Sequence, residues 1–162
     1  MNKNLMSTIV LLALSMVLIS PVKAITKETY TSHMELELID PGIQWVSEGI
    51  LYIEDSYWSG TCEGTLGRKG TYEGWVNVSI NLATQEGTVS EKFKITITKG
   101  RSRGTLSGSS RGKITMPQFS GTFVATHGTG DFEGVKIKGS FEGFHPDLEH
   151  IVAEAEGTIK YP

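Results

Sequence analysis

The feature that most constrains this chain is a strict alternation of apolar and polar residues in several separate segments. The alternating segments are Met34–Leu38, Val76–Leu82, Phe93–Ile97 and Ile151–Tyr161. Successive side chains of a β-strand point to opposite faces, so this period of two predicts strands with one buried face and one wet face. A helix needs a period near 3.6, which fits only one short turn, at Pro146–His150. The fold is therefore predicted to be all-β.

Turn signals separate the alternating segments at short intervals. They include Asp40-Pro41-Gly42, Lys99-Gly100 and a Gly/Ser-rich stretch from Gly104 to Gly112. All 19 glycines lie after residue 41, which is typical of a domain with many turns and bulges. Strands of this number and spacing predict a single antiparallel barrel or sandwich of about eight strands.

One face of the last third of the chain distinguishes these two architectures. Its residues are Val135, Ile137, Gly139, Phe141 and Gly143, so large side chains alternate with glycine. Glycine at inward positions relieves crowding where strands bend around a corner. The pattern favours a closed β-barrel, and a β-sandwich is the alternative.

The start of the chain has the three parts of a secretory signal in order. Lys3 gives the positive n-region, Leu5–Ile19 is an uncharged apolar stretch, and Pro21 precedes a small residue at Ala24. An apolar stretch of this length fits a signal peptide better than a spanning helix, which needs about 20 residues. We expect residues 1–24 to be a signal peptide cleaved after Ala24, and an uncleaved N-terminal anchor is the alternative.

Cleavage would leave residues 25–162 as one domain, secreted or held in the cell envelope or periplasm. After cleavage no membrane span is expected, since no second apolar stretch of that length follows. The mature chain would carry 13 basic and 18 acidic side chains, a net charge of −5. This charge argues against a nucleic-acid partner. The sequence does not indicate an oligomeric state.

Cys62 is the only cysteine, so no disulfide can form within the chain. A buried cysteine that packs as a small apolar residue is expected, although pairing between chains or reactivity is an alternative. Metal sites built from several cysteines are excluded.

Three glycine-rich or aromatic segments carry a resemblance to a known family. They are Phe119–Phe123, Gly128–Gly134 and Gly139–Gly143, followed by the last alternating segment. Over residues 115–161 the chain resembles the allene oxide cyclase-like barrel group, including its small uncharacterised exported members. The resemblance implies a calycin-type barrel of eight strands with an apolar interior. Plant members cyclise a fatty-acid epoxide, but their catalytic carboxylate and water-holding residues match no position here, so the resemblance does not carry over their activity.

Two motifs are similar to catalytic or cofactor-binding signatures. Gly108–Gly112 reads G-x-S-x-G, with Asp147 and His150 downstream in the order of a catalytic triad. That motif requires a strand, a sharp turn and a helix, and no helix follows it, so a hairpin tip is expected. Gly128–Gly134 reads G-x-G-x-x-x-G without a surrounding βαβ unit and is predicted to be a turn. No cofactor is expected.

The segment His145–His150 holds four potential metal ligands, with His127 upstream. Imidazole and carboxylate together suit zinc. Ligands of such sites usually come from several strands, so an exposed loop without metal is expected.

A run of five basic residues reverses the acidic character of the chain locally: Lys99, Arg101, Arg103, Arg111 and Lys113. It could contact phosphate head groups or an anionic polysaccharide. The simpler interpretation is a charged hairpin that remains soluble.

Aromatic residues are concentrated in the first half of the chain. Five of them are the candidate ligand-binding residues: Trp45, Tyr57, Trp58, Tyr72 and Trp75. Aromatic rings on the outer face could stack on sugars. Trp75 is expected on that face, because it alternates with Val76, which is predicted to point inward. Burial in the barrel or at its ends is the alternative for most of them.

Asn77-Val78-Ser79 is an N-glycosylation sequon in a chain that is expected to be exported. Its use would depend on the host. Its position in the middle of a predicted strand weighs against modification.

Two functional hypotheses remain. The first is a non-catalytic protein that binds a small apolar ligand inside the barrel or a glycan or other component at the cell surface. The second is a cyclase or isomerase that acts on a lipid-like substrate inside the barrel. The acids of the alternating segments (Glu35, Glu37, Glu154, Glu156) fall on the wet face, and no acid–base pair is visible in the strands. The first hypothesis is therefore favoured, and whether the protein is an enzyme stays open.

Overall fold

The computed structural model describes residues 26–98 and 102–162, and nearly all of this part of the chain is β-strand. The predicted signal peptide, its cleavage site, Lys99 and Arg101 lie outside the described residues. The elements are β1 (Lys27–Asp40), β2 (Ile43–Ser47), β3 (Ile50–Gly64), β4 (Gly67–Asn81), β5 (Glu86–Ile97), β6 (Gly104–Thr115), β7 (Gln118–Gly128), the 3-10 turn η1 (Gly130–Phe132), β8 (Lys136–Phe144) and β9 (His150–Lys160).

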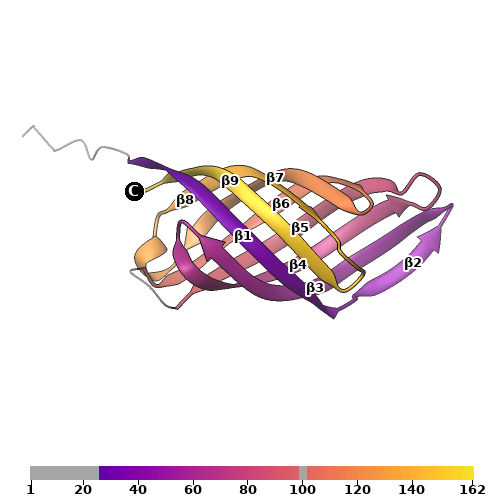
Figure 1. Ribbon diagram of the computed structural model, residues 1–162, viewed down its shortest axis with the longest axis horizontal. Coiled ribbons are helices and arrows are strands. Elements are labelled where there is room, and N and C mark those ends of the chain that lie inside the picture. Colours follow the sequence, from indigo (N-terminus) through magenta and orange to yellow (C-terminus); the bar gives the residue numbers. More distant parts are fainter. Residues whose placement is uncertain (1–25, 99–101) are drawn as a thin grey trace, which may run out of the picture.

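Eight of these strands form a closed antiparallel barrel. The strand order is β1-β9-β8-β7-β6-β5-β4-β3, and the pairing of β1 with β3 closes the ring. Strand β2 pairs with β3 alone and extends past one end of the barrel (Figure 1). The predicted barrel is confirmed, and the sandwich alternative is wrong because the hydrogen bonding continues around the whole ring.

The alternation places most of the apolar side chains inside, as the sequence predicts, but Leu82, expected on an inward face, is 51% exposed in the turn after β4. Buried core residues come from the predicted inward faces of β1, β5 and β9, including Met34, Phe93, Ile95 and Ile159. On the face of β8, Ile137 is fully buried. Burial of such side chains stabilises the fold by about 1.5–3 kcal/mol each before the entropy cost.

The two ends of the barrel differ. At one end, Phe132 of η1 and Val135 insert into the interior and pack with Leu106 and Ile159, all of them buried. A backbone hydrogen bond of 2.9 Å from Thr129 N–H to Thr105 O ties the η1 segment to β6. We call this the closed end. The other end, which holds β2 and the β4–β5, β6–β7 and β8–β9 connections, is the open end.

A β-bulge changes the parity of β3. The register with β4 shifts between Ile53 and Ser56, and Asp55 in the bulge has a positive φ of 55°. The backbone N–H of Asp55 donates a 2.8 Å hydrogen bond to Oδ1 of Asn77. Residues of a regular strand that are an odd number of positions apart point to opposite faces, as Ile53 and Trp58 would. The extra residue of the bulge reverses this, so both side chains point into the barrel.

The prediction that the Gly/Ser-rich stretch Gly104–Gly112 forms a turn is wrong. The stretch forms most of β6, paired on both sides with β5 and β7. Small residues are needed there because the walls crowd: a Cβ on Gly108 would lie 2.0 Å from the backbone oxygen of Val124. Glycine here marks close approach of two strands rather than a loop.

The helical turn expected at Pro146–His150 is also wrong. The segment is a bend in the β8–β9 connection, in which Oδ1 of Asp147 accepts a 2.8 Å hydrogen bond from the backbone N–H of Glu149. This Asx-type bond replaces the helical hydrogen bond. Among the described residues, no helix is long and apolar enough to cross a membrane.

Candidate functional site

The open half of the barrel contains a cavity of about 440 Å³. Apolar side chains from six of the strands form much of its wall: Leu36, Val76, Phe93, Phe123, Phe141 and Ala153. The exposed Leu148 of the β8–β9 connection and partly buried residues such as Ile80 and Met116 lie at its mouth. A concave apolar site with a few polar groups is the usual form of a small-molecule site.

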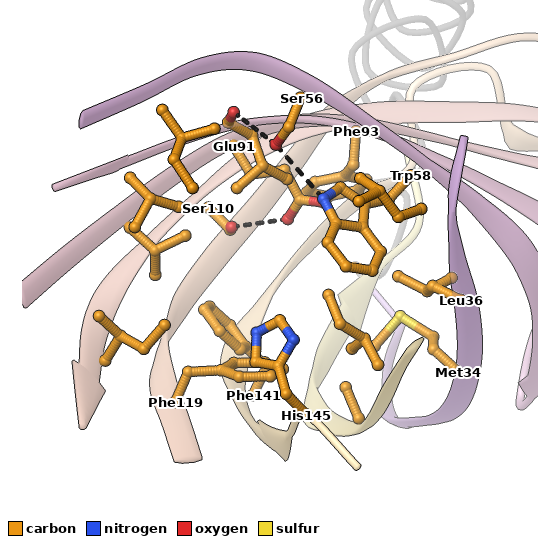
Figure 2. Close-up of a pocket in the computed structure, with 18 of the residues that line it drawn as sticks. Met34, Leu36, Ser56, Trp58, Glu91, Phe93, Ser110, Phe119, Phe141 and His145 are labelled. Atoms are coloured by element: carbon orange, nitrogen blue, oxygen red, sulfur yellow. Dashed lines mark hydrogen bonds between the residues drawn. The ribbon is translucent and has the colours of Figure 1, made fainter. Parts of the chain in front are cut away.

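The main polar feature of the cavity is the carboxyl group of Glu91 on β5. The hydroxyl of Tyr72 on β4 donates a 2.7 Å hydrogen bond to Oε1, and Oγ of Ser110 on β6 donates one of 2.9 Å to Oε2. Figure 2 shows Ser110 next to Glu91 in the cavity wall, with the hydrogen bond between them drawn as a dashed line. Three neighbouring strands thus hold one carboxyl group in a fixed position.

Burial raises the pKa of Glu91 from its ordinary value of 4.5 to about 7, and the hydrogen bonds from Tyr72 and Ser110 oppose this rise only in part. The surface that Glu91 retains borders the cavity. Burial, together with the neighbouring Glu91, also raises the pKa of the Tyr72 phenol, which therefore stays a neutral donor. At neutral pH, both protonation states of Glu91 are populated.

A glycine makes room for this carboxyl group. Gly74 on β4 lies opposite Phe93, and a Cβ at this position would lie 2.3 Å from Oε1 of Glu91 and 3.1 Å from Cε1 of Tyr72. Any larger side chain would displace the carboxylate or its partner. The position of Glu91 therefore depends on the sequence of the neighbouring strand.

A second hydrogen-bonded group, Ser56 and Trp58 on β3, lies in the same cavity wall, with Val76 of β4 between Ser56 and Glu91 (Figure 2). Ser56 Oγ donates to the backbone oxygen of Val76 (3.0 Å) and accepts from Nε1 of Trp58 (3.3 Å). Within the described chain, no buried side-chain N or O atom lacks a hydrogen-bond partner. The polar groups of the cavity are thus held in place before any ligand binds.

His145 enters the cavity wall from the β8–β9 connection. Its ring packs edge-on against Trp58 and Phe119, with ring centroids 5.8 and 5.4 Å away (Figure 2). Burial lowers the pKa of His145, so its imidazole is neutral at neutral pH. The residue contributes an aromatic surface and a polar ring near the mouth.

The five predicted aromatic residues do not form one site. Trp58 and Tyr72 are buried, 7% and 6% exposed, and line the cavity. The other three lie outside: Tyr57 stacks on Trp75 with ring centroids 5.3 Å apart, and Trp45 stacks on Tyr52 at 5.2 Å. Trp45 and Trp75 are each 40% exposed.

The sequence motifs have other roles than those suggested by their patterns. Ser110 of the G-x-S-x-G motif is not at a hairpin tip; it lies inside β6 and bonds to Glu91. Asp147 and His150 form a 2.8 Å contact with each other on the surface. Asn77 is exposed on β4, and its side-chain oxygen accepts the hydrogen bond from Asp55.

The metal candidates do not come together in one site, and the described basic candidates lie on the surface. Among the described residues, no group of three or more His, Cys, Asp or Glu side chains is placed to hold a metal ion. The expectation that the whole segment His145–His150 is an exposed loop is wrong for His145, which is partly buried and faces the cavity. Arg103, Arg111 and Lys113 are exposed, the last two on the outer face of β6.

Cys62 is buried, 5% exposed, as expected for a cysteine that packs in the core. Its Sγ lies 3.0 Å from Oγ of Ser32, within a hydrogen bond. Burial raises the pKa of the thiol. The reactive form is therefore disfavoured.

Sequence reasoning missed Glu91, and it considered Ser110 and His145 only as parts of a G-x-S-x-G motif and of a metal-ligand cluster, not as cavity residues. The four acids expected on the wet face (Glu35, Glu37, Glu154 and Glu156) are exposed. The expectation left out Glu91, which has the same parity as Phe93 two positions later and points inward with it. That signal was present in the sequence. Ser110 was hidden in a run of glycine and serine, and His145 in a loop.

Compared with known families and curated proteins, the chain matches no family and no curated protein. The fold and the cavity define a class of protein: a small antiparallel β-barrel, closed and packed at one end and hollow at the other. The resemblance to the allene oxide cyclase-like group stays a prediction.

Proposed function

We propose that this protein binds a small, largely apolar molecule inside its barrel, without chemical change, outside the cytoplasm. The observation that carries the proposal is the cavity of about 440 Å³ with apolar walls and one fixed polar group. Sites of about 300–1,000 Å³ accommodate small-molecule ligands. The predicted signal peptide supports the extracytoplasmic location.

The physical driving force is the burial of ligand surface. Transfer of 100 Å² of apolar ligand surface from water into the cavity is worth about 2.5 kcal/mol before the costs of association. The polar groups that surround Glu91 are already hydrogen-bonded, so they orient a ligand without reorganisation. A molecule with an apolar body and one polar group fits both features.

A fluorescence titration tests this proposal. In a Trp45→Phe/Trp75→Phe variant, Trp58 is the remaining tryptophan and lines the cavity. Titration with the neutral fluorophore phenylnaphthylamine should quench Trp58 and enhance the probe at one site per chain. Ala153→Phe, which adds bulk inside the cavity, should abolish this signal.

The matched control is Val124→Phe, since Val124 is exposed on the outer wall of β7. This variant should bind the probe as the parent does. Absence of binding by the parent, or equal binding by Ala153→Phe, would contradict an interior site. Native mass spectrometry of the protein from its own host should then reveal a co-purifying apolar mass.

One observation favours a second candidate, a cyclase or isomerase that acts on a lipid-like substrate in the same cavity. A carboxyl group with a pKa of about 7 in an apolar site is suited to act as a general acid or base. An isomerase would return an added or co-purified ligand with the same mass but a new chromatographic retention time. Glu91→Gln would abolish this conversion, and recovery of unchanged ligand from the native protein supports binding alone.

A further inference from the structure

We propose that the ligand is an apolar molecule with one protonated amine, and that its ammonium group pairs with the carboxylate of Glu91 inside the cavity. This inference rests on the proposed binding function and adds the chemical class of the ligand. It predicts weaker binding of a fatty acid, whose carboxylate would lie beside the ionised form of Glu91. It also distinguishes the site from a purely apolar pocket.

The first argument is the balance of charge in the cavity. Among the described residues, no Lys or Arg lines it, and its other titratable groups are Tyr30, Tyr72 and His145. Burial raises the pKa of both phenols and lowers that of His145, so all three are neutral near pH 7. An ionised Glu91 would therefore be a negative charge without a counter-charge in its own cavity.

The second argument is the hydrogen bonding of the carboxyl group. Each oxygen of Glu91 accepts one bond, from Tyr72 or from Ser110, and both partners are hydroxyl donors. A carboxylate has about four acceptor positions, so two remain for a ligand. This arrangement suits the ionised form, and an ammonium group supplies the donors and the positive charge together.

The third argument is the charge around the mouth. Exposed carboxylates lie at the strand ends and connections of the open end: Asp40, Glu48, Glu86, Asp147 and Glu149. Acidic and basic side chains are mixed at the closed end, where Lys27, Lys160, Glu28 and Asp131 lie. The basic groups near the open end are His150, which contacts Asp147, and Lys113 on β6, so the acidic groups outnumber them. A rim of net negative charge attracts ligands of opposite charge and raises their association rate.

The pairing implies a pH dependence. Because the pKa of Glu91 is about 7, about half of the sites are ionised at pH 7 and about 1% at pH 5. Apparent affinity falls with the fraction of the competent state, so amine binding should weaken about 50-fold between these pH values. The groups that face Glu91 from the surrounding elements are Tyr72 and Ser110 on its neighbouring strands, Tyr30 on β1 and His145 at the mouth.

The test compares three ligands that share one tail: decylamine, decanol and decanoic acid, each displacing phenylnaphthylamine at about pH 7.5. Decylamine should bind at least tenfold more tightly than the other two. Glu91→Gln should remove this preference, and Glu156→Gln, on the exposed outer face of β9 toward the closed end, should keep it. Calorimetry in buffers of different ionisation enthalpy should detect proton release when the native protein binds decylamine at pH 7.

The outcomes separate this inference from the proposed function. Equal binding of decylamine and decanol by the native protein, or a preference retained in Glu91→Gln, would overturn the amine inference and leave the binding function intact. Failure of all three ligands and of the fluorophore would overturn both. If Glu91→Gln does not fold, the pH series on the native protein decides, and a pH-independent affinity for decylamine refutes the pairing.

Discussion

Replacing Glu91 by Gln should change how the stability of the protein depends on pH. The folded pKa of Glu91, about 7, lies above its ordinary value of 4.5, because burial disfavours the charged form. Between these values the unfolded chain releases the proton and the folded chain keeps it. The native protein therefore loses stability as pH rises from 4.5 to 7, and the full cost remains above pH 7.

The magnitude follows from the pKa difference. One pKa unit corresponds to about 1.4 kcal/mol, so the rise from 4.5 to about 7 costs about 3 kcal/mol at alkaline pH. Gln has nearly the same shape and no charge, so Glu91→Gln removes this cost. Its amide must reorganise the bonds to Tyr72 and Ser110, which adds an offset that is the same at every pH.

Urea denaturation of the native protein, Glu91→Gln and the exposed control Glu86→Gln, at about pH 5 and about pH 8.5, measures this effect. Relative to the native protein, Glu91→Gln should gain about 2–3 kcal/mol between the two pH values. Glu86→Gln should show little change. A free-energy difference between the native protein and Glu91→Gln that does not vary with pH would refute the buried, pKa-raised carboxyl group.

Three further predictions concern other parts of the barrel. Phe132→Ala should reduce the free energy of unfolding by about 3–5 kcal/mol, because this buried ring fills the closed end; a loss under about 1 kcal/mol would show that the end is not packed. Lys94→Met should raise the pKa of Glu73, because the hydrogen bond from Lys94 lowers this pKa in the native protein. An NMR titration would detect the rise. The loss of stability should stay under about 1 kcal/mol, because the pair is partly exposed. Cys62 should react with a thiol reagent only after denaturation, because its thiol is buried and its pKa raised; rapid labelling of the native protein would contradict this.

Local alternation in the sequence determined the strands and most of their inward faces. A strand has a period of two whatever its partners, so Met34, Phe93 and Ile159 could be assigned to the interior before any pairing was known. The same rule, extended two residues back from Phe93, assigns Glu91 to the interior. The acidic side chain of the site was therefore predictable, and it was missed because charged residues are rarely buried.

Tertiary structure alone decided the closure, the bulge and the cavity. Closure pairs β1 with β3, and no local pattern specifies which strands meet. The bulge at Asp55 depends on the amide of Asn77 on the next strand, and it determines that Trp58 faces inward. Ser110 joins the site only because β6 lies beside β5. The cavity exists because the inward side chains of eight strands do not fill the space that the barrel encloses. These features depend on distances between residues remote in sequence, and periodicity carries no information about such distances.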